Sequence, residues 1–401
     1  MKKLILLLSM LLIFLLVACG SDANDEAHEN DGADESDVIY EYDEHEYENY
    51  EEYIPELVYE YEEINDIEDD VIYEHEIDWD IPARIYDITE LAAYYFGILQ
   101  AAWDDDDGEM WGEPLHVPVA LFCEETNMFA VNRPYARYEL VREYVNGTAV
   151  YVGTSEETPW DSRFIYSYVD WDGQEGVFYS WQFLRSNYYV RWDSVGGHRN
   201  SINDLSLRNI AAIAHGGFHT LQQDLIGMRG ATPPPLGSEN AWISLMLEIN
   251  ALVLAFESNS DAVRLAAVHD ALSIRHVRRY AYSGAGANEN RIKLGEGTAV
   301  YTELHLILSR DEIMDTVRQW PEIFMDIPNV ATAAIGYGYF GGALYGMLLD
   351  SFGVDWRHDV QGGTDLGLLL QEALGITEFI PLEDINLERY GYSEIVARVR
   401  G

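Results

Sequence analysis

The clearest helical pattern in the chain runs over residues 204–225. Its apolar positions recur at spacings of three and four, which places their side chains on one face of an α-helix. Helices are also expected over about 87–103, 240–256 and 338–350, after Asp261, from about Asn290 and in the last sixty residues. The apolar face of the first pattern consists of Leu207, Ile210, Ala214, Phe218, Leu221 and Leu225.

Strand patterns precede this helical half. Residues 117–123 and 128–132 predict two strands around a turn, and 148–152 predict a third. Between Arg163 and Trp192 aromatic residues alternate with polar ones, which is typical of strands with one face in water, or of a substrate groove. The acidic run 104–107 is expected to form a solvated turn after the first helix. The pattern therefore predicts an α+β protein, with a small strand-rich portion over 81–200 and a mainly helical portion over 201–401.

The first nineteen residues have the pattern of a targeting segment. Lys2 and Lys3 precede an apolar run over 4–18, which is too short to span a membrane comfortably. The run ends in Leu16-Val17-Ala18-Cys19, which resembles the lipobox of bacterial lipoproteins. The resemblance implies cleavage before Cys19, lipidation of that cysteine and attachment to the extracytoplasmic face of a cell membrane. A plain secretory signal is the alternative.

Residues 20–80 hold 27 Asp or Glu and no Lys or Arg, out of a net charge of −47 for the whole chain. The stretch is expected to be a disordered acidic spacer that lifts the following portion away from the membrane or through a wall. Calcium binding by the acids, or docking of its tyrosines on a partner, are the alternatives. Because phosphate contacts need Lys and Arg, this charge argues against nucleic acid as a partner.

With Cys19 lipidated, Cys123 is the only other cysteine. An intramolecular disulfide and a cysteine-based zinc site are then excluded. Stability must come from a hydrophobic core, for which the composition of 48% hydrophobic residues is sufficient.

His215 and His219 lie four residues apart inside the predicted helix 204–225. Their imidazoles therefore leave the same side of the helix one turn apart, the arrangement with which two histidines bind one zinc ion. In the metallopeptidase motif the residue after the first histidine is a glutamate, which acts as general base. Here that position is Gly216. Two glycines within a helix equally fit a metal cleft or a tight helix crossing.

Later motifs extend the pattern in a fixed order. These motifs are the ending Phe218-His219-Thr220-Leu221-Gln222, Leu247-Glu248, the Arg-rich stretch 270–279, Glu296-Gly297-Thr298-Ala299-Val300-Tyr301, Tyr339-Phe340-Gly341-Gly342, and the run 344–350. Together with His215 and His219 they are similar to the gluzincin group of zinc metallopeptidases, including uncharacterised bacterial members. The similarity covers roughly 115–375.

This resemblance implies a zincin-like fold and one zinc ion held by His215, His219 and Glu296. Glu248 is the alternative third ligand, and its other interpretation is a buried acid paired with Arg275 or Arg278. Tyr339 would donate a hydrogen bond to an oxyanion, or else pack in the core.

Three functions remain open. The first is a surface lipoprotein with a gluzincin-like domain that binds zinc but, with Gly216 in place of the base, has little or no peptidase activity. The second is an active metallohydrolase with a substitute carboxylate such as Glu248, acting on a peptide or protein. The third is a surface binding protein without metal.

Overall fold

The predicted signal peptide (1–19), with Cys19, and the predicted spacer (20–80) lie outside the part of the chain that the structure describes. The computed structural model describes residues 88–123, 127–134, 138–143, 148–154, 166–171, 173–180, 202–227, 236–327 and 329–400. All of these residues belong to one compact unit.

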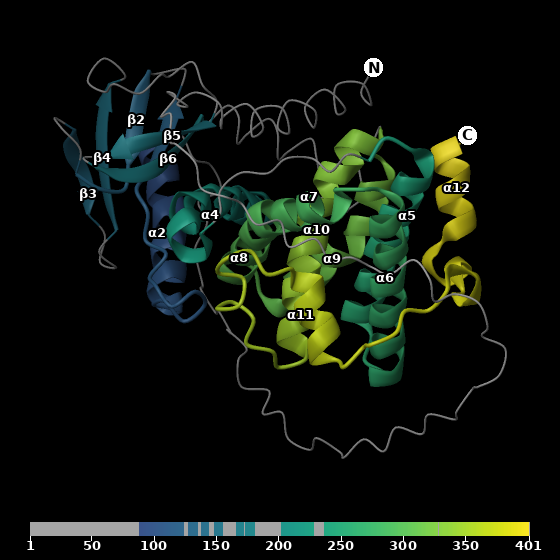
Figure 1. The fold of residues 1–401 in the computed structure, drawn as a ribbon. Helices are drawn as coiled ribbons and strands as arrows, with labels where there is room; N and C mark the ends of the chain where they lie inside the picture. Colours follow the sequence, from purple (N-terminus) through teal and green to yellow (C-terminus); the bar gives the residue numbers. More distant parts are fainter. Residues whose placement is uncertain are drawn as a thin grey trace, which may run out of the picture. The chain divides into compact units, whose positions relative to one another are not determined.

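The described residues form a mixed helical and sheet fold, which agrees with the predicted α+β class at that level (Figure 1). The strand-rich part contains α2 (Ile88–Asp106), β1 (Val119–Cys123), β2 (Met128–Val131), β3 (Glu139–Glu143), β4 (Ala149–Thr154), β5 (Tyr166–Trp171) and β6 (Gln174–Ser180). The helical part contains α4 (Ile202–Ile226), α5 (Glu239–Glu257), α6 (Asp261–Ala281), α7 (Ala285–Ile292), the π-helical turn η2 (Lys293–Gly297), α8 (Thr298–Ile307), α9 (Arg310–Met325), α10 (Val330–Ser351), α11 (Leu366–Ala373), the short 3-10 turns η3 (Leu382–Asp384) and η4 (Leu387–Tyr390), and α12 (Tyr392–Arg400).

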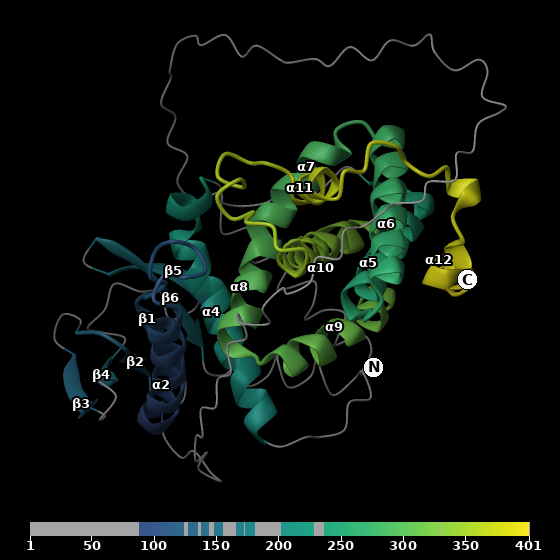
Figure 2. The same cartoon turned by 90° about the horizontal axis from the view of Figure 1, so that it is seen from below.

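The six strands in the described part of the chain form one sheet in the order β3-β4-β2-β1-β6-β5. Neighbouring strands are antiparallel except for β1 and β6, which pair in parallel with Val119 opposite Val177. Helix α2 packs on this sheet through contacts with β1 to β4. In Figure 2 the strands accordingly lie together beside α2. The predicted pair of strands around residues 124–127 is confirmed as the hairpin of β1 and β2.

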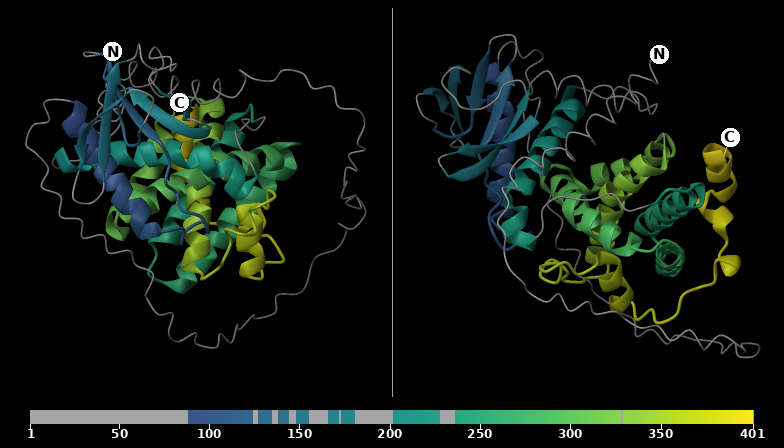
Figure 3. Two further views of the ribbon diagram at one scale, coloured as in Figure 1. Left: turned by 90° about the vertical axis from the view of Figure 1, so that its left-hand side faces the viewer. Right: turned by 45° about the horizontal axis from the view of Figure 1, so that its top comes forward.

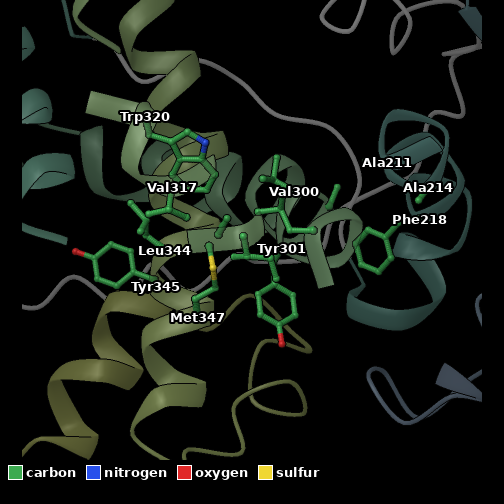
Figure 4. Packing of buried hydrophobic residues seen from close by; sticks show 14 of the residues in the cluster. Ala211, Ala214, Phe218, Val300, Tyr301, Val317, Trp320, Leu344, Tyr345 and Met347 are labelled. Carbon is green, nitrogen blue, oxygen red and sulfur yellow. The ribbon is translucent and has the colours of Figure 1, made fainter. Parts of the chain in front are cut away.

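Helix α8 lies in the middle of the helical part, where it packs against α4 on one side and α10 on the other. Figure 4 shows Val300 and Tyr301 of α8 between Phe218 of α4 and Leu344 of α10. Helices α5 and α6 run side by side, and the C-terminal α12 packs on α5 (Figure 3). The core is thus continuous from the sheet-facing helices to the C-terminus.

Several elements differ from the sequence-based expectations. Helix α10 begins at Val330, eight residues earlier than predicted, because Asn329 caps it by accepting a hydrogen bond from the backbone N–H of Thr332. Helix α9 was not predicted, although Ser309 and Glu312 form a capping box that marks its start. Strand β3 was not predicted either.

The acidic run after the first helix is not simply a solvated turn. Helix α2 continues to Asp106, which is buried. Its carboxylate accepts hydrogen bonds from the backbone N–H groups of Gly108 and Met110, and therefore caps the chain where it leaves the helix. Burial raises the pKa of Asp106.

Among the helices that the structure describes, only α5 is long and apolar enough to cross a membrane by length and composition. Most of this stretch is buried within the protein. A core helix of a folded domain passes the same test, so α5 is weak evidence for a membrane span.

Glycines allow η2 to lie directly against α10. A β-carbon on Gly297 would come within 2.4 Å of Gly342 Cα, and one on Gly342 would come within 2.5 Å of the Lys293 carbonyl oxygen. Because both obstacles are backbone atoms, neither can turn aside as a flexible side chain could. The two backbones can approach this closely only while both positions lack a side chain.

We expect Gly342→Ala to lower the free energy of unfolding by roughly 1–3 kcal/mol, the usual cost of overpacking a core. Gly286→Ala, in helix α7, is the matched control. The β-carbon added there would meet only the Arg279 side chain, at 3.4 Å. It should be neutral or stabilising by up to about 1 kcal/mol. Urea denaturation of both variants measures the difference, and equal stabilities would contradict the close backbone contact.

Candidate metal centre

Helix α4 carries both candidate histidines and is fixed to the sheet at that point. The Tyr179 hydroxyl of β6 donates a buried 2.7 Å hydrogen bond to the Ala212 carbonyl, one turn before His215. Gly217 faces the segment before β1, where an added β-carbon would lie 2.8 Å from Val117 Cγ2. The absence of a side chain at Gly217 thus lets the helix approach this segment closely, which explains one of the two glycines as a packing residue.

Glu296 lies in the π-helical turn η2, between Gly295 and Gly297. A π-turn inserts an extra residue into a helix and occurs often at functional sites. The close contact of Gly297 with Gly342 fixes the turn against α10. The carboxylate of Glu296 consequently points towards α4 and reaches both histidines.

The three predicted ligands converge on one point. The Nε2 atoms of His215 and His219 are 3.0 Å apart, and Glu296 Oε2 lies 3.6 Å from the first and 3.3 Å from the second. Glu296 and His219 are buried, whereas the His215 side chain is 17% exposed. The group could hold a metal ion.

These separations match the geometry of zinc. A tetrahedral ion bound about 2.0–2.1 Å from each ligand atom separates those atoms by about 3.3 Å. Glu296 Oε2 is also buried without a hydrogen-bond partner in the described part of the chain. A carboxylate oxygen that faces two imidazole nitrogens without a hydrogen bond is suited to an ion between them.

The outward-facing nitrogens of both imidazoles have acceptors. His215 Nδ1 lies 3.0 Å from Glu303 Oε2, and His219 Nδ1 lies 2.9 Å from Gln222 Oε1. Each Nδ1 therefore carries a proton, which leaves the lone pair of a neutral ring on Nε2. Such outer partners orient metal-binding histidines and raise their basicity.

The charges at this centre favour a cation. Burial alone would lower the pKa of His215, but Glu303 and Glu296 outweigh it and raise this pKa to about 9. Burial would likewise raise the pKa of Glu296, yet His219 and His215 hold it well below its usual range. With neutral imidazoles the two carboxylates give this group a charge of −2, which a divalent ion would balance.

No protein-family model, curated protein or solved structure matches the chain significantly. The assignment of this centre therefore rests on its residues and their geometry.

Glu248, the alternative third ligand, belongs to a different cluster. It is fully buried in α5 and accepts hydrogen bonds from Arg278 at 2.5 Å, Tyr337 at 2.6 Å and Tyr345 at 2.7 Å. Arg278 also pairs with Glu289 at 2.7 Å. The structure therefore supports the interpretation of Glu248 as a buried acid paired with Arg278, and not as a metal ligand. Arg275, the other candidate partner, pairs with Asp365 instead.

Tyr339 and Gly216 both lie next to the centre. The Tyr339 ring is parallel to the His215 ring, with an interplanar angle of 2° and 6.0 Å between centroids. Gly216 is buried on α4 directly after His215. A hydrogen bond from Tyr339 to an oxyanion stays a prediction.

Two residues of the centre were not predicted as such. Glu303 lies seven residues after Glu296, a spacing that would place both on one face of a regular helix, and this is a usable signal. Gln222 lies three residues after His219, also on the same face. Both are polar side chains on the faces of α8 and α4 that meet each other.

Two neutralising substitutions separate the candidate third ligands. We expect Glu296→Gln to weaken zinc binding by more than about 100-fold, because even changes in outer partners cost about 10–100-fold. Glu248→Gln should leave zinc affinity close to that of the wild type, but lower the free energy of unfolding by about 3 kcal/mol, because it breaks a buried ion pair. Competition titration with a zinc chelator and urea denaturation measure the two effects. The reverse pattern would make Glu248 the ligand.

Proposed function

We propose that this chain is a lipid-anchored surface protein with a zincin-like, gluzincin-related domain that binds one zinc ion and has little or no peptidase activity. The observation that carries the proposal is the convergence of His215, His219 and Glu296. The order of these three residues along the chain is the motif order of the gluzincin group. As expected for that motif order, the histidines and Glu296 come from two different helical elements.

The residues of the centre could hold zinc with three ligands and one open position. Bound there, zinc would polarise a carbonyl group and lower the pKa of a water molecule. Glu303 would orient the His215 ring by accepting a hydrogen bond from Nδ1 of that ring, and Gln222 would orient the His219 ring by accepting one from Nδ1 of His219. Tyr339 lies beside His215, with its ring parallel to the imidazole, and would be a neighbour of a bound ion.

Among the described residues, the metal centre lacks a group placed to accept a proton from a zinc-bound water molecule. Gly216 occupies the position of the general base and has no group that could take a proton from water. Of the other described carboxylates, Glu303 faces His215 Nδ1, on the side of the ring away from the ligand atoms. Glu248 is saturated by Arg278 and two tyrosine hydroxyls. These contacts favour a domain that has lost its base over one that uses Glu248 as a substitute.

The proposed location depends on residues outside the described part of the chain. Cys19 would carry the lipid, and residues 20–80 would separate the zinc-binding domain from the membrane surface. The ligand of such a protein would be a peptide or protein outside the cell. Nucleic acid is disfavoured as a partner by the net charge of −47.

The metal content of the purified full chain tests the first part of the proposal. We expect about one zinc per chain by elemental analysis after loading and dialysis, and none in a His215→Ala/His219→Ala double variant. A wild type without zinc would favour the surface binding protein without metal.

Restoring the base tests the second part. We expect Gly216→Glu to raise hydrolysis of a fluorogenic protein substrate by about 10²–10⁴-fold, the usual contribution of general acid–base catalysis. Gly216→Gln is the matched control, since it adds nearly the same volume without a proton acceptor, and it should stay at the level of the wild type. Rapid, chelator-sensitive turnover by the wild type would instead support a substitute base.

A further inference from the structure

Gln222 makes contacts with both halves of the candidate metal centre. It is fully buried on α4, three residues after His219. Its Oε1 lies 2.9 Å from His219 Nδ1. Its Nε2 lies 2.5 Å from the Gly295 carbonyl, 3.0 Å from the Leu294 carbonyl and 3.0 Å from Thr298 Oγ1. One side chain thus joins a histidine of α4 to the turn that carries Glu296.

The chemistry of these partners fixes the orientation of the amide. The carbonyl oxygens of Leu294 and Gly295 can only accept hydrogen bonds, so the group that faces them must be the NH₂ of Gln222. The Thr298 hydroxyl donates to the Leu294 carbonyl, which leaves its oxygen as an acceptor as well. The amide oxygen of Gln222 must then face His219. A reversed amide would bring oxygen against oxygen in a buried place.

The orientation of the amide in turn fixes the histidine. An amide oxygen accepts, so His219 Nδ1 must donate, and a neutral His219 then has its lone pair on Nε2. That nitrogen is the one that faces Glu296 at 3.3 Å and His215 at 3.0 Å. The other tautomer would place a hydrogen at the point where the three ligand atoms meet.

The same amide supports the unusual backbone of η2. In the described turn the carbonyls of Leu294 and Gly295 both lean towards α4, where the two protons of the Gln222 NH₂ meet them. Gly295 directly precedes Glu296, so a bond to its carbonyl limits how far the ligand-bearing residue can move.

We propose that Gln222 is a positioning residue of the metal centre, which selects the Nδ1-protonated tautomer of His219 and holds η2 with Glu296 in reach of it. This role rests on the proposed binding of zinc, and it adds the residue that couples the ligands of α4 to the ligand of η2. Gln222 itself does not contact the ion.

The first test compares Gln222→Met with Thr298→Val. Methionine fills a similar volume without the amide, so the variant loses the bonds to both His219 and η2. We expect its zinc affinity to fall by about 10–100-fold in a chelator competition. Thr298→Val removes one of the three acceptors around the NH₂ group and the hydroxyl's own bond to the Leu294 carbonyl, but it leaves the contact of Gln222 with His219 in place, so it should lower the affinity less than Gln222→Met. Equal affinities of Gln222→Met and wild type would overturn the role of Gln222.

The second test needs no metal and no variant at Gln222. In ¹⁵N-histidine NMR spectra of the wild-type chain without zinc, His219 should carry its proton on Nδ1, with its signals assigned by their loss in His219→Gln. A proton on Nε2 alone would overturn the proposal even if zinc binds. If the wild type does not bind zinc, the proposed function is contradicted. The tautomer measured without zinc still decides separately whether Gln222 controls His219.

Discussion

Three potential ligand atoms, two imidazole nitrogens and one carboxylate oxygen, are held within 3.6 Å of each other at the contact between α4 and η2. Such a group is unfavourable unless positive charge is placed among its members. The raised pKa of His215 and the lowered pKa of Glu296 both favour a protonated imidazole beside an ionised carboxylate, which places positive charge in the group. A divalent cation satisfies it more completely, because it can contact all three atoms at once. The packing around the centre keeps these three atoms close together.

A second group of buried charges shows what a purely structural acid looks like in the same protein. Both oxygens of Glu248 accept hydrogen bonds from hydroxyl or guanidinium groups, so no further partner is needed. Glu296 Oε2 is equally buried but has no hydrogen bond in the described structure. The contrast between a saturated and an unsaturated carboxylate distinguishes a structural acid from a candidate ligand without reference to any related protein.

The sequence contains most of the local information but little about which faces meet. Apolar spacing identifies α4, and the four-residue spacing of His215 and His219 places both rings on one side of it. The choice between Glu248 and Glu296 depends on how α5 and η2 lie relative to α4, which is a matter of tertiary packing. The π-turn adds a further difficulty, because one extra residue changes the direction of Glu296 relative to a regular helix. Glu303 had only its spacing to reveal it, and Gln222 only its spacing and its place in the motif ending, since polar residues on helix faces usually point to solvent.

The most direct measurement is anomalous diffraction at the zinc edge from crystals of the zinc-loaded protein. We expect one strong peak about 2.0–2.2 Å from His215 Nε2, His219 Nε2 and an oxygen of Glu296, the usual ligand distances of zinc. A peak at any other place, or no peak between these three residues at saturating zinc, would contradict the assignment of the centre.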